Sequence, residues 1–173
     1  MDNKLFMPLV IVCIATHTVR SVYEILKHKK KLNPGKLSFV IIFTNMAILW
    51  ISWFALCSLD PFKIYLAGIL RYSGIALAGI GIITFLTALF TIKTLESYDG
   101  DLITSGIYSK IRHPMYLGFI LWCIGFPVFQ GAVFSFFLSF LFIANILFWR
   151  HLEEIELENR FTDYGKYKKT ALF

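Results

Sequence analysis

The chain has 173 residues, a net charge of +6 and a composition that is 57% hydrophobic, with 18 phenylalanines. Charged residues make up only 16% and gather in blocks between long apolar runs. A soluble domain of this length could not bury so much apolar side chain, so the composition indicates an integral membrane protein. The basic runs lack the interleaved glycine and aromatic residues of an RNA-binding surface, and we expect no nucleic-acid partner. Cys13, Cys57 and Cys123 stand isolated in apolar runs, so we interpret them as core residues and expect no metal site.

The first half of the chain predicts three membrane-spanning helices, which together occupy residues 1–92. The first apolar run covers residues 5–22, the second covers 37–59, and the third has an uncharged core at 72–92. Each run is close to the about 20 residues that a helix needs to cross a bilayer. A polar segment, residues 93–113, follows the third run.

The second half begins with 37 residues that carry no formal charge. As one helix at ~1.5 Å per residue they would extend about 55 Å, far beyond a hydrocarbon core of ~30 Å. Pro127 and Gln130-Gly131 supply a break near the middle of this run. We therefore predict that residues 114–150 form a tight helical hairpin with two rather short limbs, 114–128 and 132–150, and that a tail follows at 151–173.

The expected fold is therefore all-α: a single polytopic membrane domain with about five transmembrane helices, residues 1–173. Of the 17 lysines and arginines, 14 fall in three segments that five spans place on one side of the membrane, namely 20–36, 93–112 and 150–173. By the positive-inside rule this side is the cytoplasm and the N-terminus lies outside. The polar segment and the C-terminal tail are then expected to meet on one cytoplasmic face.

Three polar residues punctuate the end of the first span at about one per turn: His17, Arg20 and Glu24. We interpret them as side chains that snorkel to the membrane interface. The alternative is that they line a cavity, which is where ionisable residues within a span usually point.

The junction between the polar segment and the hairpin reads Arg112-His113-Pro114-x-Tyr116. Proline suits the first turn of a helix, so the sequence predicts a helix that starts at Pro114 with His113 at its cap. Residues 104–108 are expected to form a turn into a short helix that ends at His113. A helix start presents unpaired N–H groups and the positive end of the dipole, which bind a carboxylate or phosphate. The alternative is an interface anchor, with Arg112 and Tyr116 at the headgroups.

An acidic pair, Glu153-Glu154, follows the hairpin, and Arg150 precedes it by three and four residues. On a helix this spacing puts the arginine within reach of either carboxylate. Together with the helix start, these groups would suit an amino-acid zwitterion, which needs donors for its carboxylate and an acceptor for its ammonium. A helix end whose charges are simply solvated has the same composition, and spacing does not distinguish the two interpretations.

Two stretches of the chain combine into one motif across roughly residues 100–170. They read Leu102-Ile103-Thr104-Ser105-Gly106-Ile107-Tyr108-x-x-x-Arg112-His113-Pro114-x-Tyr116 and, beyond the hairpin, Glu153-Glu154-x-x-Leu157-x-x-x-Phe161 with Tyr164-x-x-Tyr167. This combination resembles the isoprenylcysteine carboxyl methyltransferase family, to which phospholipid methyltransferases are related.

The resemblance implies a membrane-embedded enzyme that uses S-adenosyl-L-methionine (AdoMet), held between the cytoplasmic segment and the C-terminal helix. Its methyl acceptor, a lipid-linked or small hydrophobic molecule, would enter from the membrane lipids. By position, Glu153 would meet the ammonium of the cofactor. The other residues that the resemblance implies at the cofactor site are Leu102, Ile103, Tyr108, His113, Pro114, Met115 and Tyr116.

The chain departs from the family pattern at the residue for the acceptor. The family arginine lies four residues before the first glutamate of the pair, and that position is Trp149 here. We expect Arg150, displaced by one, to orient the acceptor carboxylate, and Glu154 to complete the catalytic pair. A His-Thr pair typical of the family is Gly100-Asp101 in this chain, so a cofactor contact is expected to differ there.

The leading hypothesis is an AdoMet-dependent membrane methyltransferase that O-methylates the carboxylate of isoprenylcysteine or a similar lipid-linked small molecule. One alternative is a phospholipid N-methyltransferase, whose amine acceptor must lose a proton to a base such as Glu154. Two others are a non-catalytic protein that binds lipid or a partner, and a sterol-type reductase that uses nicotinamide. The charge gathered at the site discriminates a carboxyl from an amine acceptor, and the sequence leaves that choice open.

Overall fold

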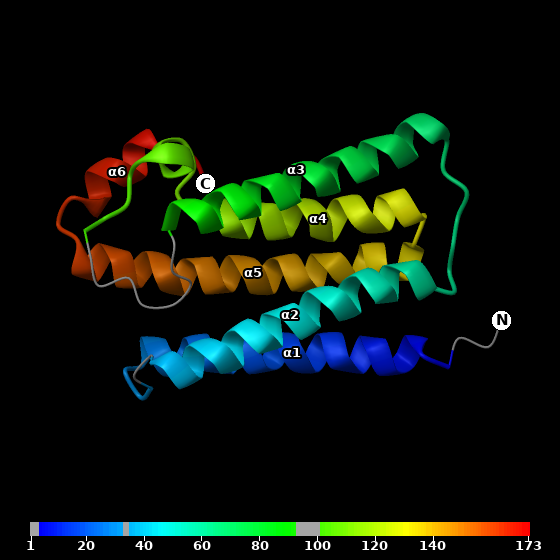
Figure 1. Ribbon diagram of the computed structural model, residues 1–173, viewed down its shortest axis with the longest axis horizontal. Coiled ribbons are helices and arrows are strands. Elements are labelled where there is room, and N and C mark those ends of the chain that lie inside the picture. The colour runs from blue at the N-terminus through cyan, green and yellow to red at the C-terminus, as the bar shows by residue number, and fades with distance from the viewer. Residues whose placement is uncertain (1–3, 33–34, 93–100) are drawn as a thin grey trace.

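The computed structural model describes residues 4–32, 35–92 and 101–173, and its elements are helices. They are α1 (Phe6–His28), α2 (Lys36–Leu59), α3 (Gly68–Ile92), the 3-10 helix η1 (Gly106–Ser109), α4 (Pro114–Gln130), α5 (Val133–Arg160) and α6 (Tyr164–Thr170). The five long helices lie along the long axis of the molecule, and η1 and α6 lie together at the end opposite the N-terminus (Figure 1). The predicted all-α architecture is confirmed.

Four of these helices, α1, α2, α3 and α5, are long and apolar enough to cross a membrane, and the chain is an integral membrane protein. The remaining long helix, α4, is apolar but has only 17 residues, which is about 26 Å at the rise of an α-helix. The short limb that the sequence predicts is therefore α4 alone. The other limb, α5, has 28 residues because it continues as a charged extension, residues 150–160, which lies outside the apolar span.

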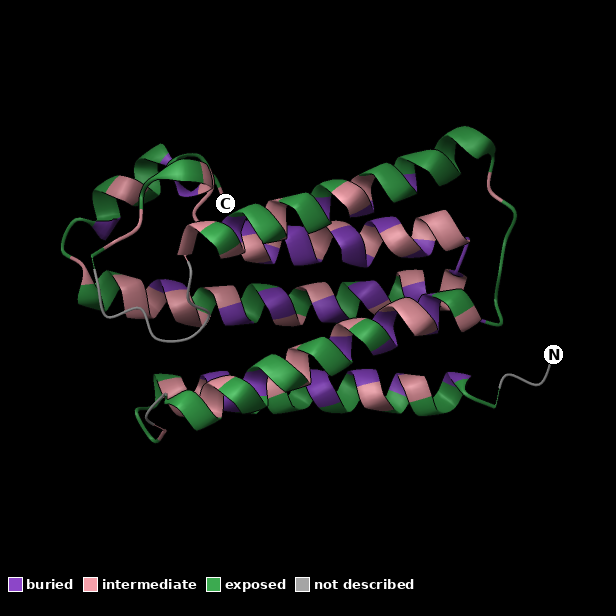
Figure 2. Ribbon diagram, in the orientation of Figure 1, coloured by how far each residue is buried: buried purple, intermediate pink, exposed green. Residues whose placement is uncertain are grey.

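Large apolar side chains stay exposed on the outer faces of the long helices, as Figure 2 shows along α3. Ile69 and Phe90 are 85% and 74% exposed, which suits a surface covered by lipid tails that are as apolar as the side chains. The core lies between α1, α2, α4 and α5, where Trp53 and Phe142 are buried. The three cysteines are buried there with free thiols, so their interpretation as core residues is confirmed.

Helices α3 and α4 approach each other closely because glycines lie at their contact. A Cβ added at Gly74 would lie 2.8 Å from the carbonyl oxygen of Gly125, and one added at Gly81 would lie 2.7 Å from that of Gly118. Any larger residue at these positions would push the two backbones apart. The pair α3–α4 therefore forms one tightly packed wall of the bundle.

A tight turn joins α4 to α5 at Gly131, whose φ of 62° lies in the left-handed region. A side chain at this position would collide with the backbone of Ile64. The predicted hairpin is confirmed, but the expectation that Pro127 helps to break the chain is wrong. Pro127 lies buried inside α4, because neighbouring helices in a membrane protein stabilise a helix that lacks one backbone hydrogen bond.

The connection from α2 to α3 is tied to the start of α5. The buried carboxylate of Asp60 accepts hydrogen bonds from the backbone N–H of Ser135 at 2.7 Å and from its hydroxyl at 2.8 Å. The N–H of Ile64 donates to the carbonyl of Gly131 at 2.9 Å. Since the first N–H groups of a helix need an acceptor from elsewhere, Asp60 caps α5. We call this region, residues 60–67 and 131–135, the capped end.

The short helix predicted before α4 ends earlier than expected, at Ser109. Beyond it the chain pairs with the C-terminal tail: the N–H of Leu172 donates to the carbonyl of Lys110 at 2.8 Å, and that of Arg112 donates to the carbonyl of Leu172 at 2.9 Å. Because the tail pairs with these backbone groups, the helix does not reach His113. Residues 93–100 of the predicted cytoplasmic segment lie outside the described residues.

Candidate functional site

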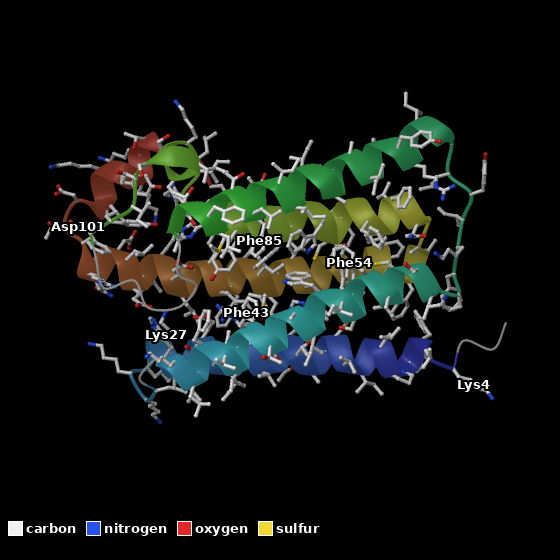
Figure 3. All side chains as sticks on the ribbon, in the orientation of Figure 1. Lys4, Lys27, Phe43, Phe54, Phe85 and Asp101 are labelled. Atoms are coloured by element: carbon white, nitrogen blue, oxygen red, sulfur yellow. The ribbon has the colours of Figure 1, made fainter. Side chains whose placement is uncertain are left out.

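A cavity of about 720 Å³ lies at the end of the bundle that carries η1 and α6. Its wall combines residues of α1, α2, α3, α4 and α5. In Figure 3, Lys27, Phe43 and Phe85 mark three sides of this wall, and Lys4 lies at the far end of the molecule.

The cavity has a charged end and an apolar end. Its ionisable residues lie toward the ends of their helices and comprise Arg20, Glu24, Lys27, Lys30, Arg112, His113, Glu153, Glu156 and Arg160. Large apolar residues continue toward the middle of the bundle and comprise Phe43, Met46, Trp50, Phe85, Phe119 and Trp149. The cavity is therefore amphipathic along its length.

His113 connects the start of α4 to both glutamates. It occupies the cap position and Pro114 the first turn, as the sequence predicts. The buried imidazole lies with Nε2 3.4 Å from a Glu154 oxygen and Nδ1 4.0 Å from a Glu153 oxygen. The His113 side chain does not cap the helix, so the first-turn N–H groups keep their capacity to bind an anion at the cavity wall.

Glu154 is engaged in a cluster of cations and is not part of the cavity wall. Its carboxylate forms ion pairs with Arg112 at 3.2 Å and with Lys168 at 3.3 Å. The adjacent His113, helped by Lys168, lowers the pKa of the Glu154 carboxyl to about 2, although burial opposes the shift. Glu154 is consequently a stable anion that joins α5, the helix start and the tail.

Arg112 and Tyr167 fasten the C-terminal tail beside the cavity. One terminal nitrogen of Arg112 donates to the carbonyls of Lys168 and Ala171, both at 2.8 Å. The hydroxyl of Tyr167 donates to the carbonyl of Tyr108 at 2.5 Å. Burial above all raises the pKa of Tyr108, so its phenol stays protonated and remains a hydrogen-bond donor at the cavity wall.

The structure divides the residues that the sequence singled out. Those that line the cavity are Tyr108, His113, Met115, Tyr116 and Glu153. Those that do not are Leu102, Ile103, Pro114, Arg150 and Glu154. Of the predicted residues, the cavity wall therefore contains those at the start of α4, together with Tyr108 of η1 and Glu153 of α5.

Arg150 does not line the cavity because it lies on a different side of α5 from the wall residues. The wall residues of this helix recur every three or four positions, namely Trp149, Glu153, Glu156, Leu157 and Arg160. A displacement of one residue turns a side chain by about 100° around the helix. Arg150 accordingly lies over the ring of Phe173, 4.6 Å from its centre. Although its spacing put it within reach of either glutamate, it forms an ion pair with neither in the described part of the chain.

The first helix supplies two charged residues that the sequence assigned to the membrane interface. Arg20 and Glu24 line the cavity and pair at 2.5 Å, with side chains that are 16% and 8% exposed. His17, one turn deeper, is buried and stacks on Phe142. The snorkelling interpretation is therefore wrong, and the cavity alternative holds for Arg20 and Glu24. The spacing of about one polar residue per turn was the sequence signal for a cavity-facing side of α1.

The apolar wall contributed by α2 could not be found from the sequence. Phe39, Phe43, Met46 and Trp50 lie in a span whose residues are apolar on every side. Such a helix carries no amphipathic pattern, so nothing in the sequence distinguishes its lipid side from its cavity side.

Comparison with known proteins identifies the family. A family model described as phospholipid methyltransferase (PEMT) matches residues 69–164, more than half of the chain. This chain belongs to the phospholipid methyltransferase family. The match includes η1, α4 and α5, and the resemblance recognised from the two-part motif is confirmed.

The protein-S-isoprenylcysteine O-methyltransferase of Schizosaccharomyces pombe is a similar protein. It is 35% identical over 85 residues, which are 45% of this chain and 34% of the relative. The chain therefore spans about a third of the length of this curated relative. No solved structure matches. Helices α1 and α2 lie outside the family match, so Arg20 and Glu24 reach the cavity from outside it.

Proposed function

We propose that this protein transfers a methyl group from AdoMet to the carboxylate of a lipid-linked small molecule of the isoprenylcysteine type. The observation that carries the proposal is the amphipathic cavity, whose charged end holds His113 and Glu153 and whose other end is aromatic. Pockets of ~300–1,000 Å³ hold small-molecule ligands. A volume of about 720 Å³ leaves room for a cofactor beside the head of an acceptor.

The start of α4 suits the amino-acid end of AdoMet, which is a zwitterion. Glu153 would accept hydrogen bonds from the ammonium, and the N–H groups of the first turn would bind the carboxylate. When bound, AdoMet supplies a methyl group on a sulfonium. The residues of the wall would align the acceptor with that group and exclude water, because a carboxylate attacking a sulfonium needs little other assistance.

The charge of the cavity wall favours an anionic acceptor. The basic residues of the wall are Arg20, Lys27, Lys30, Arg112 and Arg160, and the acidic ones are Glu24, Glu153 and Glu156. Basic residues are therefore in excess even before the positive sulfonium of the cofactor is added. An acceptor carboxylate is already ionised at neutral pH and requires no general base.

An amine acceptor would need a base, and Glu154 is poorly suited to that role. It pairs with Arg112 and Lys168 outside the cavity wall. With its pKa lowered to about 2, the carboxylate is a weak proton acceptor, since a general base works best when its pKa lies near the ambient pH. In this proposal Glu154 positions His113 and the tail instead of reacting.

A phospholipid N-methyltransferase is the second candidate, because the matching family is described by that activity. The basic residues of the wall would then bind the lipid phosphate, and a wall carboxylate such as Glu153 would receive the proton of the amine. The two candidates differ in the acceptor and share the cofactor.

The test is cofactor binding followed by a choice of acceptors. The detergent-purified protein is expected to bind AdoMet and S-adenosylhomocysteine saturably, and to methylate S-farnesyl-N-acetylcysteine from labelled AdoMet. Phosphatidylethanolamine in the same assay tests the second candidate. Arg71→Gln is a matched control, since Arg71 contacts Phe129 at the other end of the bundle. Folded wild-type protein that binds neither ligand would overturn the methyltransferase proposal, and methylation of the phospholipid alone would replace the acceptor.

The charge distribution supports placing the cavity on the cytoplasmic side, with the N-terminus outside. The native cysteines are buried, so a single added cysteine reports its own side of the membrane. Lys4→Cys is expected to react with a membrane-impermeant maleimide on intact cells, and Lys169→Cys only after lysis, because both positions are exposed. The reverse pattern would overturn this orientation.

A further inference from the structure

We infer that Arg20 of α1 binds the anionic head of the methyl acceptor. The inference rests on the proposed function and names a substrate-binding residue that lies outside the family match at residues 69–164. It is based on the position of the guanidinium in the cavity wall and on the side chains that hold it there.

Arg20 reaches the cavity beside the region proposed for the cofactor. It lines the same cavity wall as Tyr116 and Glu153. Tyr116 belongs to the first turn of α4, and Glu153 belongs to the cavity face of α5. An anion bound by Arg20 would therefore lie next to the cofactor, where a methyl acceptor must be.

Two aromatic rings and one carboxylate hold the guanidinium in place. Its carbon lies 5.6 Å from the ring centre of Tyr23 and 5.8 Å from that of Trp149. Glu24 pairs with one terminal nitrogen at 2.5 Å. A guanidinium has five N–H donors in a rigid plane, which suits a carboxylate. The side chain of Arg20 is 16% exposed and lines the cavity wall, so a ligand there would meet its terminal N–H groups.

Trp149 is itself fixed by a polar network between α1 and α5. Its indole N–H donates to the Ser21 hydroxyl at 2.9 Å, and that hydroxyl donates to the side-chain oxygen of Asn145 at 2.8 Å. The Asn145 amide nitrogen lies 3.0 Å from Nδ1 of the buried His17. Polar groups this deep in a membrane protein pair with one another, so the network sets the position of Arg20 relative to Glu153.

Other cations of the wall have partners that leave them less available. Arg112 donates to two carbonyls of the tail and pairs with Glu154 at 3.2 Å. Lys27 pairs with Glu156 at 3.2 Å. Arg20 combines a fixed position on a rigid helix with a place in the cavity wall, and its ion pair is with Glu24 of the same helix. A specific carboxylate site requires such a fixed donor.

The test compares two probes that differ only in charge: S-farnesyl-N-acetylcysteine, which has a free carboxylate, and its carboxamide. Equilibrium binding of each is measured on the full chain in detergent, with and without S-adenosylhomocysteine. Wild-type protein is expected to bind the carboxylate about 10-fold or more tightly than the carboxamide, the scale of a charge-assisted hydrogen bond. Arg20→Gln is expected to abolish this preference, and Arg20→Lys to retain part of it.

Arg20→Gln alone leaves Glu24 buried without its partner, which destabilises proteins. The double variant Arg20→Gln with Glu24→Gln removes both charges and is the main comparison. Arg71→Gln, which removes an arginine remote from the cavity, is expected to keep the wild-type preference. The Tm in detergent and the affinity for S-adenosylhomocysteine confirm that each variant is folded.

The outcomes separate this inference from the proposed function. Equal binding of the two probes to wild-type protein, or a preference that survives in the double variant, overturns the role of Arg20 and leaves the methyltransferase proposal intact. Failure of wild-type protein to bind AdoMet or S-adenosylhomocysteine overturns the methyltransferase proposal instead. Because the probes are also measured without the cofactor ligand, the charge preference still decides whether Arg20 holds an anion.

Discussion

The two helices of the C-terminal hairpin begin in different ways. At the capped end, α5 starts where the carboxylate of Asp60 accepts hydrogen bonds from Ser135. At the opposite end, α4 starts with His113 and Pro114, without a cap from the His113 side chain, at the wall of a cavity. The chain supplies an anion to the start of α5 and leaves the start of α4 facing a cavity.

This difference separates a structural helix start from one that is available to a ligand. Any helix N-terminus attracts an anion, because its first N–H groups lack partners and the dipole is positive there. Near α4, the carboxylates of Glu153 and Glu154 approach His113. We therefore expect changes at the capped end to alter stability and changes at the start of α4 to alter ligand binding.

Removing the cap should have the largest effect. Asp60→Ala leaves a buried N–H and a buried hydroxyl of Ser135 without an acceptor, which we expect to lower the free energy of unfolding by about 2–4 kcal/mol. A thermal unfolding curve in detergent measures the loss, and AdoMet affinity below the transition should stay at the wild-type value. Asp163→Ala is the control, because this side chain is 75% exposed and pairs with an exposed lysine. Equal losses of unfolding free energy in the two variants would contradict the role of Asp60 in capping α5.

Gly131→Ala tests the turn at the capped end. The left-handed backbone and the adjacent Ile64 backbone both oppose a side chain there, so we expect a loss of about 1–3 kcal/mol. Gly165→Ala, in α6 at the cavity end, has open space around its Cβ and should be neutral or slightly stabilising. The same unfolding assay compares them, and a neutral Gly131→Ala would contradict the close approach of the two turns.

Glu153→Gln tests the cavity end. Its side chain is 40% exposed, so we expect little change in Tm, but AdoMet affinity should fall about 10-fold because a charge-assisted hydrogen bond to the ammonium is lost. Glu158→Gln is the matched control on the same helix, since Glu158 pairs with Lys168 outside the cavity wall. Unchanged AdoMet affinity in Glu153→Gln would remove Glu153 from the cofactor site.

The last prediction concerns acid stability. The pKa of Glu154 falls from its usual 4.5 to about 2 in the folded chain, so its contribution to stability is present above pH 4.5 and is lost as the pH falls toward 2. Glu154→Gln should therefore be less stable than wild type at pH 7, and the difference should shrink between about pH 4.5 and 2. Tm measured across this range checks it, and parallel curves would contradict the ion pairs of Glu154.

Much of the fold followed from the sequence because its determinants are local. Apolar runs of membrane length predicted the spans, and Pro114 predicted the start of α4 with His113 at its cap. The length of the uncharged run required a hairpin, whatever residue formed the turn. Proline is an equally local signal at Pro127, yet packing against neighbours overrode it.

The site followed only in part, since a cavity depends on which way each helix faces. Glu153 and Tyr116 could be assigned because they belong to a motif with a known arrangement. For Arg150, a shift of one residue was enough to rotate the side chain out of the cavity and over Phe173. The shift is visible in the sequence, but the sequence does not indicate which residue binds the acceptor carboxylate instead.

What the sequence determined by itself is the membrane architecture, because hydrophobic length and proline chemistry act through neighbouring residues. What the tertiary structure decided is which distant groups come together: Asp60 with Ser135 at the capped end, and Arg20 and Glu153 in one cavity wall. Spans that are apolar on every side carry no periodic signal to fix their rotation. Packing against the other helices sets it, and so places the charged residues of α1 and α5 on the same cavity.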